Sequence, residues 1–366
     1  MTGATMVTGA DGYLGRRVVS TLLARTDDPL VLAVRAADDT ELATKREWAA
    51  TAFDAAPGRI RVVAADLRQP KPFVDVDPAT VRRIVHTAAI TRFNVDRDSA
   101  RQVNLEGTAA VCDFAATCVN LDRYLVLSTL YVSGRHEGPV AEHRLDDRGF
   151  VNHYEWSKWA AEERVFGEYA HLPVSVLRLP TVIADDDSGR VTQYNAFHHT
   201  LRLFFYGLLG LVPGNPATPL SVTTAAFVSD AVAHLLDDRA PRGVFHVCAD
   251  PDDTPALGAV IDAAFAVFES DDWFRRRRIL RPIYCDEPAF DRLTSAARSM
   301  RQAVLSDVLG TVAPFGGQLY RPKTFQTDAL RSAWPGCAAP KSIPLVTSTV
   351  SHLVRTRWGK TQQEAP

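Results

Sequence analysis

The run Thr8-Gly9-Ala10-Asp11-Gly12-Tyr13-Leu14-Gly15 near the N-terminus is the strongest indication of the fold class. It follows a short apolar run at residues 5–7 and precedes a predicted helix over residues 14–23. Because glycine lacks a Cβ atom, Gly9, Gly12 and Gly15 permit a tight turn and let backbone N–H groups approach a pyrophosphate at the helix N-terminus. The pattern therefore predicts a dinucleotide site, although an isolated glycine triplet also occurs in ordinary turns between a strand and a helix.

Short β-rich runs alternate with helical stretches through the rest of the N-terminal half. The runs are continuously apolar, as expected of strands that are buried on both faces of a parallel sheet. Alternation of this kind predicts an α/β protein with a doubly wound parallel sheet, the Rossmann fold. The predicted strands lie at residues 30–34, 60–64, 84–86, 124–127 and 174–177, and the predicted helices at residues 103–118 and 154–169.

The alternation ends after Pro180, where the polar stretch Asp185–Gly189 leads into an aromatic-rich segment around Phe204. Strands predicted at residues 219–222 and 244–247, with a helix at 229–236, return the chain once to the sheet. We therefore predict two parts and a frayed tail. These are a dinucleotide-binding domain over residues 1–180 with the return around 219–248, a smaller C-terminal substrate-binding subdomain over 181–218 and 249–358, and the tail over 359–366.

Composition excludes several classes of function. The 366 residues carry a net charge of -2, so there is no overall attraction to nucleic acid or to an anionic membrane. The five cysteines have no C-x-x-C spacing, so we predict neither a metal site nor a disulfide framework. The longest apolar run, Leu203–Val212, is about half the length that a membrane span needs. We expect a cytoplasmic protein without a membrane span, and the sequence leaves the oligomeric state open.

Arg35 indicates the cofactor. A dinucleotide fold places the residue at the end of its second strand, about 20 residues beyond the turn, beside the adenine ribose. A guanidinium there would pair with the 2′-phosphate of NADP, and Arg16 could assist it, whereas an acid would favour NAD. Asp38 and Asp39 nearby keep the second option open. Asp66, after the third predicted strand, could accept from the adenine amino group.

Tyr154 and Lys158 indicate the chemistry. At helical spacing i and i+4 they share one face, so a phenol and an ammonium point into the same space. The ammonium would favour the phenolate and make the phenol a better acid. Thr129 lies at the carboxyl end of a predicted strand, where α/β sheets place their sites. The neighbouring Ser128 should point the other way because side chains alternate along a strand.

These motifs together resemble the extended short-chain dehydrogenase/reductase family. The resemblance covers about residues 4–250 and rests on the glycine turn, His86-Thr87-Ala88-Ala89, Asn104-Leu105-Glu106-Gly107-Thr108, the run Ser128-Thr129-Leu130-Tyr131-Val132, and Tyr154 with Lys158. Within the family, Arg35, Thr91-Arg92-Phe93 and Gly243-Val244-Phe245-His246 are most similar to the thioester reductase and fatty acyl reductase branch.

The resemblance implies a role for each catalytic residue. Thr129 would orient the carbonyl, Tyr154 would donate the proton in reduction, and Lys158 would hold the nicotinamide ribose and lower the pKa of Tyr154. Asn104 would be a structural member of the set. The implied contacts to NADP(H) are Thr8, Gly9, Asp11, Gly12, Tyr13, Leu14, Gly15, Arg16, Arg35, Asp66, Leu67, Ala88, Ala89, Asn104, Tyr154, Lys158, Pro180, Thr181 and Val182.

The expected function is NADPH-dependent reduction of a thioester, aldehyde or ketone. A hydroxysteroid-like alcohol dehydrogenase and a sugar-nucleotide epimerase or dehydratase are the alternatives among enzymes, and an NADP-sensing regulator is the alternative outside them. The substrate would be a small molecule or an acyl group bound to CoA or a carrier. If it is a thioester, another protein, such as an acyl carrier protein, would deliver it.

Three further features have a weaker meaning. Arg275–Arg278, next to Trp273 and Phe274, could meet a carrier or a nucleotide phosphate but is more typical of a solvated helix face. His198 and His199 fit surface or core-edge positions. A set of apolar residues recurs at helical spacing and would form either core or the wall of a substrate pocket; its members are Phe197, Leu201, Phe204, Phe205 and Leu208.

Overall fold

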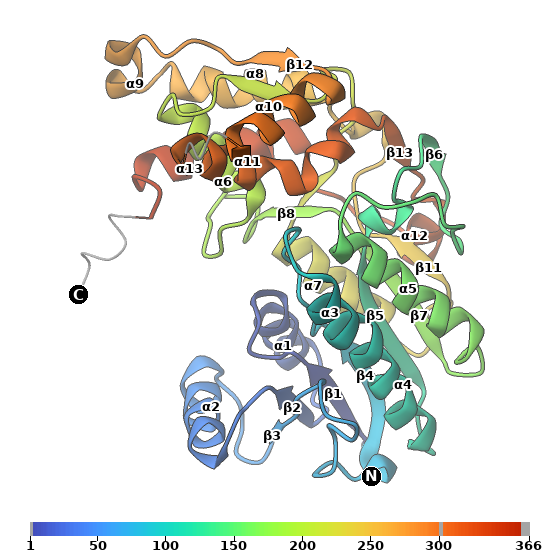
Figure 1. Cartoon of the computed structure of the whole chain (residues 1–366). Coiled ribbons are helices and arrows are strands. Elements are labelled where there is room, and N and C mark those ends of the chain that lie inside the picture. The colour runs from blue at the N-terminus through green and yellow to red at the C-terminus, as the bar shows by residue number, and fades with distance from the viewer. Residues whose placement is uncertain (1–2, 300–302, 360–366) are drawn as a thin grey trace.

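The computed structural model describes residues 3–299 and 303–359. Its lower lobe is built on a parallel sheet, and its upper lobe consists mainly of helices (Figure 1). The predicted C-terminal tail lies almost entirely outside the described residues.

The lower lobe contains a seven-stranded parallel sheet in the order β11-β7-β5-β4-β1-β2-β3. The strand order reverses between β1 and β4, and in a doubly wound sheet the crevice at such a reversal is where ligands bind. The predicted Rossmann fold is therefore confirmed. The strands are β1 (Ala4–Thr8), β2 (Leu30–Val34), β3 (Ile60–Ala64), β4 (Val81–His86), β5 (Arg123–Thr129), β7 (Val174–Leu179) and β11 (Val244–His246).

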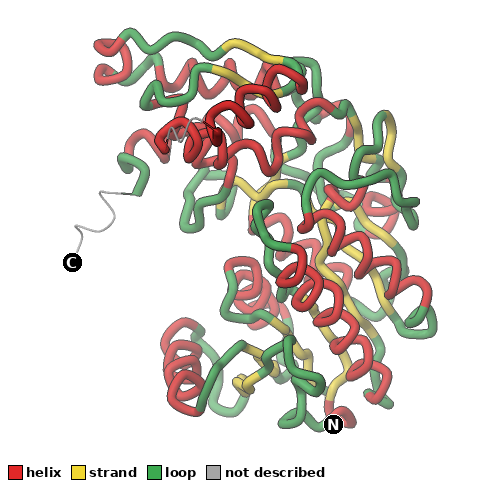
Figure 2. The backbone as a smooth tube through the Cα atoms, viewed as in Figure 1, coloured by secondary structure: helices red, strands yellow, loops and turns green. Residues whose placement is uncertain are grey.

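Helices cover both faces of this sheet (Figure 2). Successive residues of β1 belong to different cores. Val7 packs with Val18 and Leu22 on one face of the sheet, and Met6 packs with Val111 on the other. This two-sided burial explains why the strands are apolar at every position. The first face carries α1 (Tyr13–Arg25), α2 (Asp39–Ala52), α7 (Ala225–Leu235) and α12 (Asp328–Ala333), and the second carries α4 (Gly107–Thr117) and α5 (His153–Gly167).

The predicted helix at residues 103–118 has an irregular beginning. It is preceded by α3 (Arg97–Ala100) and a π-helical turn, η2 (Arg101–Glu106), before α4 starts. Asn104 in this turn is buried, exchanges two hydrogen bonds with the backbone of Ile90, and donates to Ser157 Oγ at 3.0 Å. It thereby fixes the loop after β4 against α5, which is a structural role.

The upper lobe has its own apolar core. Its helices are α6 (Ala196–Phe205), α8 (Leu257–Phe268), α9 (Asp272–Arg277), α10 (Glu287–Ser299), α11 (Ala303–Gly316) and α13 (Ser342–Arg355). Short parallel pairs support it or join it to the lower lobe: β8 (Thr181–Ala184) with β10 (Val222–Thr224), β9 (Leu211–Pro213) with β12 (Ile283–Cys285), and β6 (Gly138–Val140) with β13 (Lys323–Phe325).

One strand differs from the sequence-based expectation. The strand predicted at residues 219–222 is found as β10. It pairs with β8 and not with the main sheet, and Val222 aligns with Thr181. The predicted strand at residues 244–247 is β11, at the edge of the main sheet beside β7. None of the described helices has the length and apolar character needed to span a bilayer.

Candidate active site

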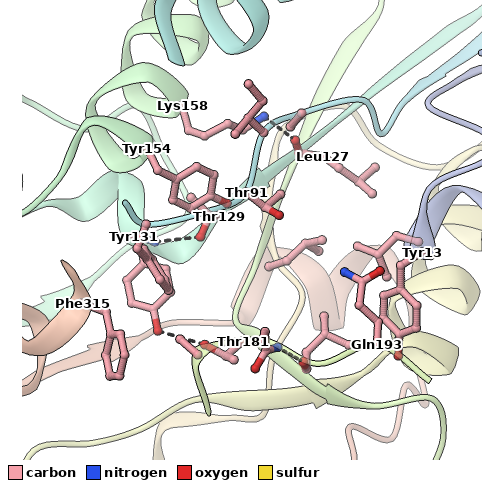
Figure 3. A pocket seen from close by; sticks show the side chains of 18 of the residues that line it. Tyr13, Thr91, Leu127, Thr129, Tyr131, Tyr154, Lys158, Thr181, Gln193 and Phe315 are labelled. Atoms are coloured by element: carbon pink, nitrogen blue, oxygen red, sulfur yellow. Dashed lines mark hydrogen bonds between the residues drawn. The ribbon is translucent and has the colours of Figure 1, made fainter. Parts of the chain in front are cut away.

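Tyr154 and Lys158 lie in the first two turns of α5, facing the carboxyl end of β5 (Figure 3). The helix begins here because the side chain of Asn152 caps it, accepting from Glu155 N at 3.0 Å. Thr129 lies beside Tyr154, and its Oγ1 accepts from Tyr131 N at 3.3 Å. Lys158 Nζ donates to the carbonyl of Leu127 at 2.8 Å. All three predicted catalytic residues are thus buried around one point of the sheet.

The pKa of Tyr154 is raised, whereas the sequence predicted that Lys158 would lower it. Burial raises the pKa of Tyr154 well above its ordinary value, and the nearby hydroxyl of Thr129 opposes that rise only in part. Burial also lowers the pKa of Lys158 to about 8, against the raising effect of Glu162. The ammonium of Lys158 is held by a backbone carbonyl and is not among the groups that lower the pKa of Tyr154, contrary to the sequence-based expectation. Tyr154 therefore remains a protonated phenol at neutral pH.

Ser128 points away from Tyr154, as strand alternation predicts. Its hydroxyl donates to Glu162, which is also paired with Arg178 at 2.7 Å in the protein interior. Arg178 in turn lies 3.4 Å from Nε2 of His246, whose Nδ1 is 2.8 Å from the carbonyl of Gln326. The four side chains of Ser128, Glu162, Arg178 and His246 are buried and support β5 and α5 from behind the site.

The glycine turn has the close approaches that the sequence predicts. Gly9 has a φ of 66°, and a Cβ there would come within 2.8 Å of the backbone of Ala88. A Cβ on Gly15 would stand 2.1 Å from the carbonyl oxygen of Gly9. Gly12 is the N-cap of α1 and offers no side-chain acceptor. The first N–H groups of α1 therefore lack a side-chain cap, and they can hold an anion.

Arg35 and two acidic residues lie near the position predicted for the adenine ribose. Arg35 is exposed at the end of β2 and lines the cavity. Asp66 lines it too, but its carboxylate is held by Arg68, with Nε at 2.9 Å. Asp38 caps α2 by accepting from Glu41 N at 2.8 Å, so this acid already has a structural partner.

Lys45 is a residue of this region that the sequence analysis missed. It reaches from α2 to the carboxylate of Asp11 in the glycine turn, at 2.6 Å. Arg16 lies over the ring of Trp48 at 4.7 Å and does not line the cavity. Only the folded chain brings α2 over the turn, so no spacing in the sequence singles out Lys45.

A continuous cavity of about 800 Å³ joins the turn to the catalytic residues. Of the predicted site residues, only Arg16 and Asn104 are absent from its lining. Those that line it are Thr8, Gly9, Asp11, Gly12, Tyr13, Leu14, Gly15, Arg35, Asp66, Leu67, Ala88, Ala89, Thr129, Tyr154, Lys158, Pro180, Thr181 and Val182.

Beyond Tyr154 the cavity continues into the upper lobe between apolar side chains. Of the five helical positions considered above, Phe197, Leu201 and Phe204 line it. Phe205 does not, because it stacks on Trp273 in the core of the upper lobe, and Leu208 is 54% exposed at the surface. Other apolar lining residues from this lobe are Val212, Leu220, Val222, Leu257, Val260, Ile261, Val312, Phe315 and Leu319.

An aromatic cluster marks the junction between the two ends of the cavity. The ring of Phe93 makes edge contacts with Tyr131 at 5.3 Å and with Tyr154 at 5.6 Å, and lies 5.9 Å from Phe315. The hydroxyl of Tyr131 is 3.0 Å from Oγ1 of Thr181 (Figure 3). Phe93 and Tyr131 were visible in the sequence as parts of motifs, whereas Phe315 comes from a segment without one.

The weaker sequence features lie outside the catalytic centre. His198 is buried and structural, within hydrogen-bonding distance of the carbonyl of Ile183 and the N–H of Asn195. Arg275–Arg278 belong to α9 and the residue after it, exposed at the outer end of the upper lobe (Figure 1). Among the described residues, no group of three or more metal-ligating side chains is placed to hold an ion.

Comparison with known proteins identifies relatives of the chain. A family model described as "Male sterility protein" matches residues 7–232, more than half of the chain. An isonitrile lipopeptide synthase of Streptomyces coeruleorubidus is 30% identical over 266 residues, which cover 67% of this chain and 18% of that protein. An isonitrile lipopeptide synthase of Mycobacterium tuberculosis is 29% identical over 214 residues, covering 49% and 8%. The chain thus spans less than a fifth of the length of either relative.

Two solved structures share the fold. One is the terminal R domain from the myxalamid PKS-NRPS biosynthetic pathway, with a TM-score of 0.76 and 22% identity, covering 98% of this chain and 92% of that one. The other is a thiolation-reductase di-domain from an archaeal non-ribosomal peptide synthetase, with a TM-score of 0.69 and 17% identity, covering 98% and 76%. The match extends through the upper lobe, where the resemblance of the sequence fades.

Proposed function

The chain belongs to the male sterility protein family, in the thioester reductase-like branch of the extended short-chain dehydrogenases/reductases, and on that premise we propose that it is an NADPH-dependent reductase of an acyl thioester. The family makes it a nicotinamide-dependent oxidoreductase. The observation that carries the finer proposal is the continuous cavity, which runs from the glycine turn past Tyr154 into an apolar chamber.

NADPH fits the polar end of this cavity. The uncapped start of α1 suits a pyrophosphate, and Arg35 offers a guanidinium for the 2′-phosphate that NADPH has and NADH lacks. Lys45 adds a second positive charge at the turn, although Asp11 partly neutralises it. Asp38 is occupied as the cap of α2, which weighs against the NAD-type arrangement of an acid on the ribose.

The catalytic residues supply proton transfer and charge stabilisation. When bound, a reduced nicotinamide delivers a hydride to the carbonyl carbon. Tyr154 is a protonated phenol and can give its proton to the carbonyl oxygen, while the neighbouring hydroxyl of Thr129 orients that oxygen. Lys158 lies one turn along the same helix, where its ammonium can stabilise the phenolate that forms.

These residues would support the reduction of a thioester to an aldehyde. Addition of the hydride and of the tyrosine proton gives a hemithioacetal. Its carbon–sulfur bond then breaks, the hydroxyl proton leaves as the carbonyl forms again, and the sulfur takes up a proton. The products are an aldehyde and a free thiol. A second NADPH could reduce the aldehyde to an alcohol at the same residues.

The apolar chamber favours an acyl group with a substantial hydrocarbon part. Phe197, Ile261, Val312 and Phe315 line it beyond Tyr154, and an apolar chain that leaves water for such a wall gains about 0.8 kcal/mol for each buried CH₂ group. The two relatives named above are isonitrile lipopeptide synthases. A carrier- or CoA-bound acyl chain is therefore the substrate class that we propose.

We also propose that one part of the chain binds the dinucleotide and the other binds the acyl group. Residues 1–180, with the return around 219–248, would hold the dinucleotide, and residues 181–218 and 249–358, together with Leu220 and Val222 at the start of that return, would hold the acyl group. The lining of the cavity supports this division, since the residues from the glycine turn lie at one end and those from α6, α8 and α11 lie at the other.

A comparison of thioesters with free carbonyl compounds tests the proposal. Purified protein would be given NADPH with an acyl-CoA series of increasing chain length, and in parallel with free ketones and aldehydes of matched length. We expect NADPH consumption and thiol release with the thioesters, and a lower KM as the chain lengthens. Consumption of NADPH with a ketone but with no thioester would replace the thioester reductase by a simple alcohol dehydrogenase.

A further inference from the structure

Asp185 is a fully buried carboxylate that the proposed chemistry does not use. It directly follows β8, is 0% exposed, and does not line the cavity. Its Oδ1 accepts from the hydroxyl of Tyr13 at 2.7 Å and from Oγ1 of Thr192 at 2.8 Å. Its Oδ2 lies 3.0 Å from the guanidinium of Arg17 and 3.5 Å from that of Arg190. The four partners come from two parts of the chain that are distant in sequence.

Two of these partners belong to the nucleotide side. Tyr13 is the first residue of α1, lies in the glycine turn and lines the cavity, and Arg17 follows one helical turn later. A change in the position of the turn therefore acts directly on the carboxylate. Burial and the hydrogen bond to Asp185 both raise the pKa of Tyr13, so its hydroxyl stays a donor at neutral pH.

The other two partners belong to the substrate side. Arg190 and Thr192 lie in the loop of residues 185–195, which joins β8 to α6. A bond from Asp185 N to the carbonyl of Arg190, at 2.7 Å, closes this loop on itself. The loop ends in Gln193 and Asn195, which line the cavity, and Figure 3 places Gln193 on the same side of the pocket as Tyr13.

The loop also contacts the strand that lines the reaction centre. Asn195 Nδ2 donates to the carbonyl of Val182 at 2.8 Å, and its side-chain oxygen caps α6 by accepting from Phe197 N at 3.1 Å. A displacement of the loop would therefore move Val182 and the start of α6 together. Phe197 itself lines the apolar chamber.

We propose that Asp185 is a positioning residue that fastens the substrate-side loop to the glycine turn, so that nucleotide binding and the order of the substrate wall are coupled. This inference rests on the proposed function in one respect, the binding of a nucleotide pyrophosphate at the turn. Coupling of this kind is reciprocal, since a ligand that orders the turn favours the loop position that binds the second substrate.

The variant Tyr13→Phe tests the coupling, because it removes one hydrogen bond to the carboxylate and keeps the ring. Tyr169→Phe is the matched control, because it removes the hydrogen bond from Tyr169 to Asp113 at 2.6 Å, outside the cavity lining. Thr192→Val removes the second hydrogen bond to the same oxygen of Asp185. Hydrogen exchange of residues 185–195 would be measured for each protein with and without NADPH, together with steady-state kinetics.

In the wild type we expect NADPH to slow exchange in both the turn and the loop. In Tyr13→Phe and Thr192→Val the loop should exchange faster before any addition and respond less to NADPH. The KM for the acyl substrate should rise about tenfold, and more than kcat falls, as expected for the loss of a hydrogen bond to a charged group. Tyr169→Phe should leave the loop and the KM unchanged.

Two results would overturn the inference. The loop could exchange equally in Tyr13→Phe and Tyr169→Phe, or it could respond fully to NADPH without the hydroxyl of Tyr13. If NADPH does not bind the wild type at all, the proposed function fails, while the comparison of nucleotide-free proteins still decides whether Tyr13 holds the loop.

Discussion

The substitution Glu155→Gln should change how the stability of the protein depends on pH. Glu155 is fully buried beside Tyr154, and burial raises the pKa of its carboxyl to about 7, despite bonds from Val151 N, Asn152 and Gln318 that favour the charged form. Gln318 and Lys323 follow α11 in the chain, and Lys323 Nζ donates a hydrogen bond to Oε1 of Gln318 at 2.8 Å.

The direction of the effect follows from proton binding. The ordinary pKa of a glutamate is 4.5, so between pH 4.5 and about 7 the folded protein keeps a proton that the unfolded chain has released. The free energy of unfolding therefore falls as the pH rises through this window. A raised pKa of this size corresponds to a loss on the order of 3 kcal/mol, at about 1.4 kcal/mol for each pKa unit.

Urea unfolding at a series of pH values measures the effect. Because Glu155→Gln removes this titration, the stability of the wild type minus that of the variant should fall by up to about 3 kcal/mol from pH 4.5 to 7. Lys323→Met provides the opposite case. Burial lowers the pKa of Lys323 to about 8, from 10.5, so its contribution to the free energy of unfolding should rise between those two values. A difference curve for Glu155→Gln that is flat over pH 4.5 to 7 would show that the pKa of Glu155 is not raised in the folded protein.

The other predictions concern the active site and the surface. Tyr154→Phe should lower turnover by roughly 100-fold or more while NADPH still binds, and Thr129→Val should also lose activity; stopped assays with parallel calorimetry measure both. Arg35→Ala should lose much of the preference for NADPH over NADH, since a bond to a charged phosphate contributes about 1.5 to 3 kcal/mol, and equal affinities in the wild type would exclude NADP specificity. Arg275→Glu with Arg276→Glu should raise the KM for a carrier-bound thioester but not for a small aldehyde, an effect that added salt should imitate; an equal response of both substrates would remove the carrier contact.

The features that could be predicted from the sequence depend on residues that lie close together along the chain. The glycine turn requires small residues at fixed spacing, and the pair Tyr154 and Lys158 requires only one helix, so both could be recognised without a structure. Ser128 was placed correctly because strand alternation is also a local rule. The doubly wound parallel sheet followed from the alternation of strands and helices, which leaves few ways to connect parallel strands.

The sequence could not predict contacts that depend on how distant elements meet. Lys45 reaches Asp11 only because α2 folds back over the glycine turn, and Asp185 faces Tyr13 only because the loop after β8 returns to α1. Helical periodicity could not divide the apolar face of α6 between the cavity and the core, so Phe205 was grouped with Phe204 although only Phe204 lines the cavity.

Deuterium transfer from NADPH to the acyl carbon would show thioester reduction by this protein. The protein would be incubated with a long-chain acyl-CoA and NADPH that carries deuterium at its transferable hydride position, and the products would be analysed by mass spectrometry. We expect an aldehyde or alcohol with deuterium on the former carbonyl carbon, release of free CoA, and loss of both products in Tyr154→Phe. Intact thioester, or a product without deuterium on that carbon, would contradict the assignment of the chain as an NADPH-dependent thioester reductase.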